Sequence, residues 1–140
     1  MADGAEKFTP RGVRNNNPGN IKKNNVRWLG LSEEQNDETF FQFTDAKYGI
    51  RALMKILLTY RFQHGLTNIW SIVERYAPSS ENNTEAYKNY LVNETGYGML
   101  QEIKFTIDDY LPVVKAIIVM ENGTMPYDEE TIIEGMKLAW

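Results

Sequence analysis

Residues 11 to 23, RGVRNNNPGNIKK, concentrate uncharged polar side chains in one short segment. Each Asn amide offers two N–H donors and one carbonyl acceptor, and this chemistry suits a hydroxyl- and amide-rich ligand such as a sugar. The mixture of Asn, Pro and Gly disfavours both helix and strand, so the segment is predicted to be a shaped loop. The alternative is a long turn in which the Asn side chains serve the backbone and bind no ligand.

Two acidic residues, Glu81 and Asp37, are the candidates for carboxylate chemistry. Cleavage of a glycosidic bond needs a carboxylic acid that stays protonated near neutral pH, and often a second carboxylate. Glu81 follows the sequence Tyr76-Ala77-Pro78 and precedes a predicted helix start. A nearby helix N-terminus would lower the pKa of Glu81, which is the wrong direction for a general acid. Asp37 lies in the acidic stretch 32–38, where acids also serve turn formation and solubility.

Apolar residues recur at helical spacing in five stretches that would position these side chains. The longest predicted helix is capped by Thr44 or Asp45 and ends at His64-Gly65, where Gly takes the left-handed conformation. Pro112 fits the fourth predicted helix only within its first turn. The other predicted starts are Thr67, Asn82 to Thr84, Thr106, and Tyr127-Asp128. The five predicted helices cover residues 45–63, 67–77, 82–96, 106–123 and 127–140.

A small β-hairpin is expected between the Asn-rich segment and the longest helix. Residues 26–31 alternate in character, residues 39–43 are rich in β-forming side chains, and the acidic stretch 32–38 would form the tip. The predicted fold is therefore mostly α (α+β), with about five helices and one small β-hairpin.

Composition favours one globular domain that needs no cofactor. The 140 residues are 42% hydrophobic and 24% charged, which predicts a single folded domain over residues 11–140. Residues 1–10 are predicted to form a flexible tail. Cysteine is absent and His64 is the single histidine, so a zinc site is not expected. No stretch has the length of a membrane span or the apolar region of a signal peptide.

The net charge is −4, yet the N-terminal part is locally basic, with six Lys or Arg against two acids in residues 1–31. A basic segment could meet nucleic acid or an anionic cell-wall polymer. Dispersed cations in an acidic protein make nucleic acid the weaker choice.

Motifs along nearly the whole chain resemble those of a group of small bacteriophage virion proteins. A looser resemblance, through the Asn-rich segment and the following Trp-x-Gly turn, is to glucosaminidases of the lysozyme superfamily. Those enzymes carry a catalytic Glu on a helix upstream of the Asn pair. In this chain the only upstream Glu is Glu6, which lies in a short Gly-containing tail and does not match that position. The phage motifs are Asn15 to Lys22, Trp28 to Leu31, Gln35, Asp37, Phe40-x-x-Phe43, Tyr48 to Ala52, Tyr76 to Pro78, Glu81-Asn82-x-Thr84-x-x-Tyr87, and Glu121-Asn122-Gly123-x-x-Pro126-Tyr127.

The resemblance implies a lysozyme-like domain with a sugar groove. Glu81 and Asp37 would be catalytic, and one Glu would suffice in transglycosylase-type enzymes, whose substrate supplies its own nucleophile. Aromatic rings would stack on pyranose faces and amides would bind acetamido groups. Arg51 would pin the loop or touch substrate. The substrate-binding candidates are Asn15, Asn17, Asn20, Trp28, Arg51, Tyr76, Asn82 and Tyr87.

Two functions are favoured and a third is weaker. The first is a phage-associated peptidoglycan-degrading enzyme, a glycosidase or lytic transglycosylase, that acts on glycan strands of the host cell wall. The second, motivated by the missing upstream Glu, is a non-catalytic virion or wall-binding protein with a lysozyme-like frame, partnered by glycan or other virion proteins. The third is nucleic-acid binding, which would show a steep salt dependence. The expected location is the virion, or the host cytoplasm before release.

Overall fold

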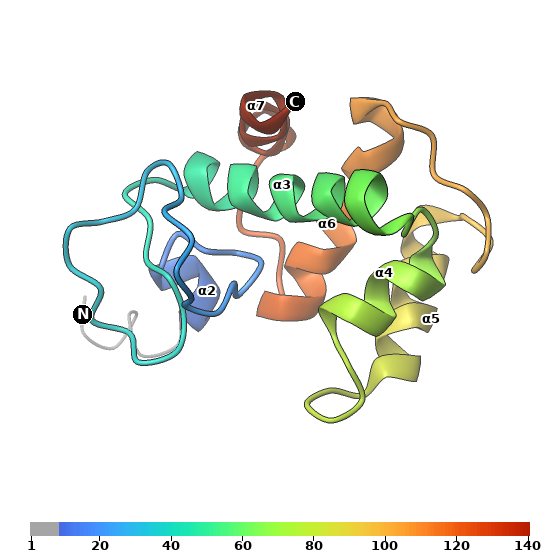
Figure 1. The fold of residues 1–140 in the computed structure, drawn as a ribbon, viewed down its shortest axis with the longest axis horizontal. Helices are drawn as coiled ribbons and strands as arrows, with labels where there is room; N and C mark the ends of the chain where they lie inside the picture. Colours follow the sequence, from blue (N-terminus) through green and yellow to red (C-terminus); the bar gives the residue numbers. More distant parts are fainter. Residues whose placement is uncertain (1–8) are drawn as a thin grey trace.

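The computed structural model describes residues 9–140, and these form helices joined by loops (Figure 1). The predicted tail, residues 1–10, falls largely on residues 1–8, which lie outside the described part. No helix in the described part is long and apolar enough to cross a membrane. The helices are α2 (Arg11–Arg14), α3 (Ala46–His64), α4 (Ile69–Tyr76), α5 (Thr84–Thr95), α6 (Ile107–Asn122) and α7 (Glu129–Ala139).

Helix α3 is the longest of these helices, and α7 packs closely against it, while α5 packs on α6. The N-cap of α3, Asp45, accepts a hydrogen bond from the backbone N–H of Lys47, and the helix ends at Gly65 with φ of 66°, so both predicted ends are confirmed. Figure 1 shows α3 running across the molecule, with α7 seen nearly end-on above it and the N-terminal segments at one end. Its buried face includes Leu53 and Leu57, which join the main hydrophobic core.

The remaining helix starts follow local capping chemistry. Thr106 accepts from the N–H of Asp109 and begins α6, as predicted. Helix α4 is capped by Asn68 rather than by the predicted Thr67, because the Asn68 and Ser71 side chains form a reciprocal capping box. Helix α5 starts within the predicted window, with Asn83 as its cap.

Pro112 does not lie in the first turn of α6, so that expectation was wrong. Pro112 is inside the helix, which begins at Ile107 and continues through the proline to Asn122. The missing proline N–H removes the hydrogen bond to the Asp108 carbonyl, one turn inside the N-terminus.

The predicted β-hairpin is absent from residues 9–140, which contain no strand, so the α+β prediction was wrong. Two isolated antiparallel bridges remain, Lys22 with Phe40 and Leu31 with Phe43. Side-chain amides take over hydrogen bonds that a strand pair would make through its backbone. Gln35 donates to the Gln42 carbonyl at 2.7 Å and accepts from the Gln42 N–H at 2.8 Å. The described chain is therefore all-helical, which overturns the expected lysozyme-like α+β shape.

The Asn-rich segment is not entirely a loop, because Arg11–Arg14 forms one helical turn. Pro10 precedes this turn as its N-cap residue, with φ of −54° and ψ of 143°. The rest of the segment packs over a second hydrophobic cluster. That cluster is built from Ile21, Phe41, Phe43 and Ala52.

Candidate functional site

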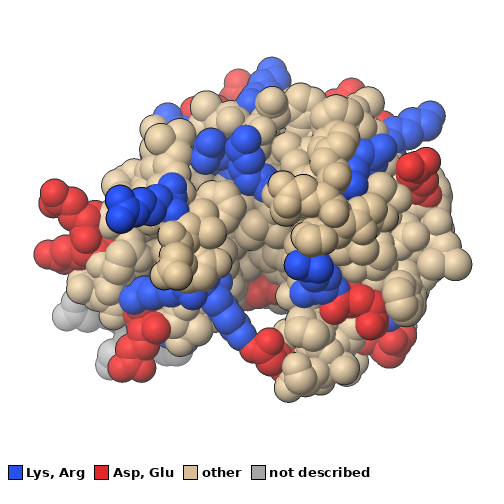
Figure 2. Space-filling view, viewed as in Figure 1, with Lys and Arg blue, Asp and Glu red and all other residues tan. Residues whose placement is uncertain are grey.

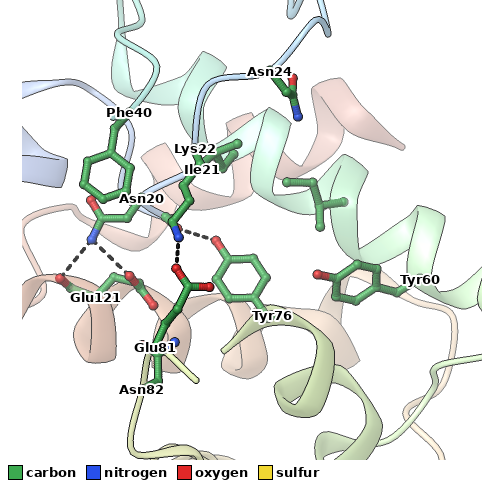
Figure 3. A pocket seen from close by; sticks show the side chains of 12 residues that line it. Asn20, Ile21, Lys22, Asn24, Phe40, Tyr60, Tyr76, Glu81, Asn82 and Glu121 are labelled. Atoms are coloured by element: carbon green, nitrogen blue, oxygen red, sulfur yellow. Dashed lines mark hydrogen bonds and ion pairs between the residues drawn. The ribbon is translucent and has the colours of Figure 1, made fainter. Parts of the chain in front are cut away.

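A pocket of about 390 Å³ lies between the Asn-rich segment and the connection from α4 to α5. Figure 2 shows this face hollowed, with a basic and an acidic side chain meeting across the opening. Figure 3 shows the lining side chains, which come from both the N-terminal segment and the helices. The lining residues are Gly19, Asn20, Ile21, Lys22, Asn24, Phe40, Ile56, Tyr60, Tyr76, Glu81, Asn82 and Glu121.

The Asn-rich wall is shaped by backbone conformations that Asn tolerates better than most residues. Asn16 and Asn20 have φ of 51° and 50°, in the left-handed region. Asn17 is fully buried and donates to the carbonyls of Ile21 and Phe41 at 3.0 and 2.9 Å. Because its carbonyl oxygen also accepts from the Ile21 N–H, Asn17 is occupied in holding the segment.

Asp37 and Asn15 form a second polar cluster outside the residues that line the pocket. Both oxygens of Asp37 accept from the Arg11 guanidinium at 2.7 Å, and one also accepts from Asn15 at 3.0 Å. The backbone N–H groups of Thr39 and Phe40 donate to the same carboxylate at 2.9 Å. The Arg11 hydrogen bonds, chiefly, hold the pKa of Asp37 well below its usual range.

Two asparagines fasten the Asn-rich segment to the C-terminal end of α6. The Asn20 amide donates to the Glu121 carboxylate at 3.0 Å and to the Glu121 carbonyl at 3.2 Å. Asn122 donates from α6 to the Pro18 carbonyl at 2.8 Å. The two partners in each pair lie more than a hundred residues apart in sequence, so the wall depends on tertiary structure.

Glu121 places a partly buried carboxyl in the pocket wall. Its second oxygen accepts from the Tyr87 hydroxyl at 2.9 Å. Burial raises the pKa of Glu121 above its usual value, and the hydrogen bonds from Asn20 and Tyr87 partly oppose that rise. A carboxyl of this kind stays protonated closer to neutral pH and can act as a general acid.

Tyrosines from α3 and α4 form the apolar side of the pocket. The Tyr76 hydroxyl donates to the Gly19 carbonyl, which fixes its ring against the Asn-rich segment. Burial raises the pKa of Tyr76, and it raises that of Tyr60 to about 12, so both phenols are neutral at ordinary pH. Both rings line the pocket, and Figure 3 shows the Tyr76 ring near Glu81 and the Tyr60 ring farther along the pocket.

An ion pair between Lys22 and Glu81 spans the pocket opening. The side chains are 57% and 50% exposed, so solvent screens their attraction and the pair contributes about 0 to 1 kcal/mol. The two residues belong to opposite walls, the Asn-rich segment and the α4–α5 connection.

The predicted site residues divide between the pocket and its surroundings. Four of them line the pocket, namely Glu81, Asn20, Tyr76 and Asn82. Tyr87 does not line the pocket, but its hydroxyl donates to the Glu121 carboxylate. Trp28 packs on the second hydrophobic cluster. Arg51 donates to the Leu138 carbonyl of α7 at 3.4 Å. The remaining predicted residues, Asp37, Asn15 and Asn17, are bound to protein groups as described above.

Glu121 was missed as a site residue by the sequence analysis. At the end of a predicted helix it reads as an ordinary exposed acid, and its burial arises from Asn20 and Tyr87, which are distant in sequence. One signal was present, because Glu121-Asn122-Gly123 belongs to the motifs that carry the phage resemblance.

Metal binding finds no support in the described residues. Within residues 9–140, no group of three or more His, Cys, Asp or Glu side chains is placed to hold a metal ion. The chemistry available at the pocket is that of carboxyl, amide, phenol and ammonium groups.

These observations define a domain whose described residues are all-helical and which holds a partly buried carboxyl in a polar pocket. A comparison with protein-family models finds no match. The chain is 42% identical to Protein P5 of Pseudoalteromonas phage PM2 over 130 residues, which are 91% of this chain and 80% of that protein. The chain therefore belongs to the family of phage protein P5, and the resemblance to phage proteins is confirmed.

Proposed function

We propose that this protein cleaves glycan strands of bacterial peptidoglycan, with Glu121 as the general acid. The single observation behind the proposal is the placement of the Glu121 carboxyl, desolvated yet facing a pocket lined with amides and aromatic rings. Glu121 is preferred over the sequence-predicted Glu81 because the Glu81 side chain is half exposed and paired with Lys22.

The proposed reaction is proton transfer from Glu121 to the oxygen of a glycosidic bond. Protonation of the leaving oxygen lowers the barrier to cleavage, and an acid with a raised pKa holds its proton near neutral pH. A second carboxylate is not required where the substrate supplies its own nucleophile, as in lytic transglycosylase chemistry. In the hydrolytic variant Glu81 would position water, once its ion pair with Lys22 opens.

The pocket chemistry suits an N-acetylated sugar. Amide side chains of Asn24 and Asn82 line the opening, where they can exchange hydrogen bonds with hydroxyl and acetamido groups. The rings of Tyr76 and Phe40 supply apolar surface for pyranose faces. A volume of about 390 Å³ is within the usual range for a small-molecule site and accommodates a short stretch of glycan.

Membership of a phage protein family supports a role for this chemistry at the host cell wall. A phage must pass the host cell wall on entry or release, and an enzyme of this kind would be carried in the virion or accumulate in the host before lysis. The proposed partners are glycan strands and other virion proteins.

The test compares Glu121→Gln with the wild type on purified sacculi, using release of soluble glycan as the readout. Loss of at least about a hundredfold in rate, with unchanged thermal unfolding, is expected for removal of a general acid. Glu81→Gln tests the rival acid, and Glu130→Gln, at an exposed position, is the surface control. Wild-type protein that releases nothing, or a fully active Glu121→Gln, would refute the enzymatic proposal.

A second candidate is a glycan-binding or virion structural protein without turnover. The observation that favours it is the occupation of both predicted acids, Asp37 by Arg11 and Glu81 by Lys22. This reading expects sacculi to bind the wild type and Glu121→Gln equally in a pull-down, with no soluble product from either.

A further inference from the structure

The Glu121 carboxyl receives one hydrogen-bond donor on each oxygen, and the two donors come from different parts of the fold. Asn20 donates to Oε1 at 3.0 Å from the Asn-rich segment. Tyr87 donates to Oε2 at 2.9 Å from α5. The Tyr87 ring is 3% exposed, so its position is fixed by the core around it. The carboxyl plane is therefore held from two sides.

These donors restrict where a proton on Glu121 can reside. The Asn20 Nδ2 group has no lone pair to accept a hydrogen bond, so the proton cannot occupy the Oε1 position that faces it. The same amide also donates to the Glu121 carbonyl at 3.2 Å, which holds it in this orientation. While the Tyr87 hydroxyl donates to Oε2, that direction is filled as well. Glu121 lines the pocket, so the remaining lone pairs of its carboxyl oxygens are the positions left for the proton.

We infer that Tyr87 is a positioning residue that, together with Asn20, directs the acidic proton of Glu121 toward the pocket. The inference rests on the proposed function for its meaning in catalysis, while the proton placement itself is a property of the resting protein. Tyr87 does not line the pocket, and it acts through Glu121 rather than on substrate.

The other ionisable groups around Glu121 are either neutral or paired with one another, so the Tyr87 hydroxyl is the group to test. Tyr76 of α4 and Tyr60 of α3 are neutral phenols that interact with this cluster. The charged groups of the pocket, Lys22 and Glu81, neutralise one another across the opening. Removal of one phenol hydroxyl changes no charge, so a change in Glu121 titration would report the lost hydrogen bond.

The experiment is an NMR titration of the Glu121 side-chain carboxyl in Tyr87→Phe, with the signal assigned by its loss in Glu121→Gln. The substitution removes a donor that favours the ionised form, so the pKa should rise by about one to two units. The alkaline limb of the activity profile should move to higher pH by the same amount, because the ionised acid cannot donate a proton.

Tyr90→Phe is the matched control, because Tyr90 is also on α5 and its hydroxyl contacts Glu94 at an exposed site. It should leave Glu121 unchanged. If Tyr87→Phe is not folded, Asn20→Gly supplies the second variant, since Gly tolerates the left-handed backbone at this position, removes the donor to the other oxygen and should also raise the pKa of Glu121. An unchanged Glu121 titration in a folded Tyr87→Phe would overturn the inference. If Tyr87→Phe raises the pKa of Glu121 while the wild type releases no soluble glycan, the positioning role is upheld and the enzymatic proposal is refuted.

Discussion

The substitution Asp37→Asn tests the polar cluster that shapes the Asn-rich segment. The folded carboxylate accepts two hydrogen bonds from Arg11, one from Asn15, and one each from the N–H groups of Thr39 and Phe40. The Asp37 side chain is 9% exposed, whereas that of Arg11 is 46% exposed. Asn can retain one oxygen, but its NH₂ group then faces the donors of Arg11 and Asn15.

The expected magnitude follows from those lost contacts. Hydrogen bonds to charged groups contribute about 1.5 to 3 kcal/mol each, and the exposure of Arg11 reduces that value. We therefore expect Asp37→Asn to lower the free energy of unfolding by about 2 kcal/mol at about pH 7, measured by urea denaturation.

The pH dependence gives the prediction its sign. The pKa of Asp37 is lower in the folded than in the unfolded state, so its contribution is complete above the unfolded value of about 4. That contribution is lost as the pH falls through the lower, folded pKa. The stability difference between wild type and variant should therefore shrink on acidification below about pH 4.

Asp128→Asn is the matched control, since Asp128 caps α7 and Asn is an equally good cap. It should leave the urea midpoint nearly unchanged at neutral pH. The reasoning would be refuted by an Asp37→Asn protein as stable as this control, or by a loss of stability that stays constant from neutral to acidic pH.

Two further predictions concern the pocket wall and its opening. Gly12→Ala should lower the free energy of unfolding by about 1 to 3 kcal/mol in thermal denaturation, because a Cβ there would lie 2.5 Å from Asn122 Oδ1 and 2.8 Å from Asn20 Oδ1; an unchanged melting temperature would contradict this packing. Lys22→Met should change stability by less than about 1 kcal/mol, since its ion pair with Glu81 is exposed; a larger loss in urea denaturation would show that the pair supports the fold.

Helix ends were predictable because capping is a local interaction. Asp45 with Gly65 and Thr106 with Gly123 bound α3 and α6, and each acts on backbone groups within a few residues. The error at α4 was one residue, where Thr67 and Asn68 are both acceptable caps and the Ser71 partner decides between them.

The absence of the hairpin and the environment of the site could not be predicted from local sequence. Residues 39–43 have the composition of a strand, yet Gln42 pairs its backbone with the Gln35 side chain, an interaction that no periodicity reveals. The environment of Glu121 likewise depends on Asn20 and Tyr87, which local pattern cannot bring together. Sequence reasoning therefore named several of the residues that line the pocket, among them Asn20, Tyr76 and Glu81, but it missed Glu121.

The joining of Asn20 and Asn122 to partners 101 and 104 residues away has a consequence for folding kinetics. Contacts of such separation form after most loop-closure entropy has been lost, so they are expected to appear late on the folding pathway. Nascent or partially unfolded chains would then lack a competent pocket even when their helices have formed. Amide hydrogen exchange should show the Asn-rich segment opening before α3 does, so that heat or urea disrupts the pocket before global denaturation.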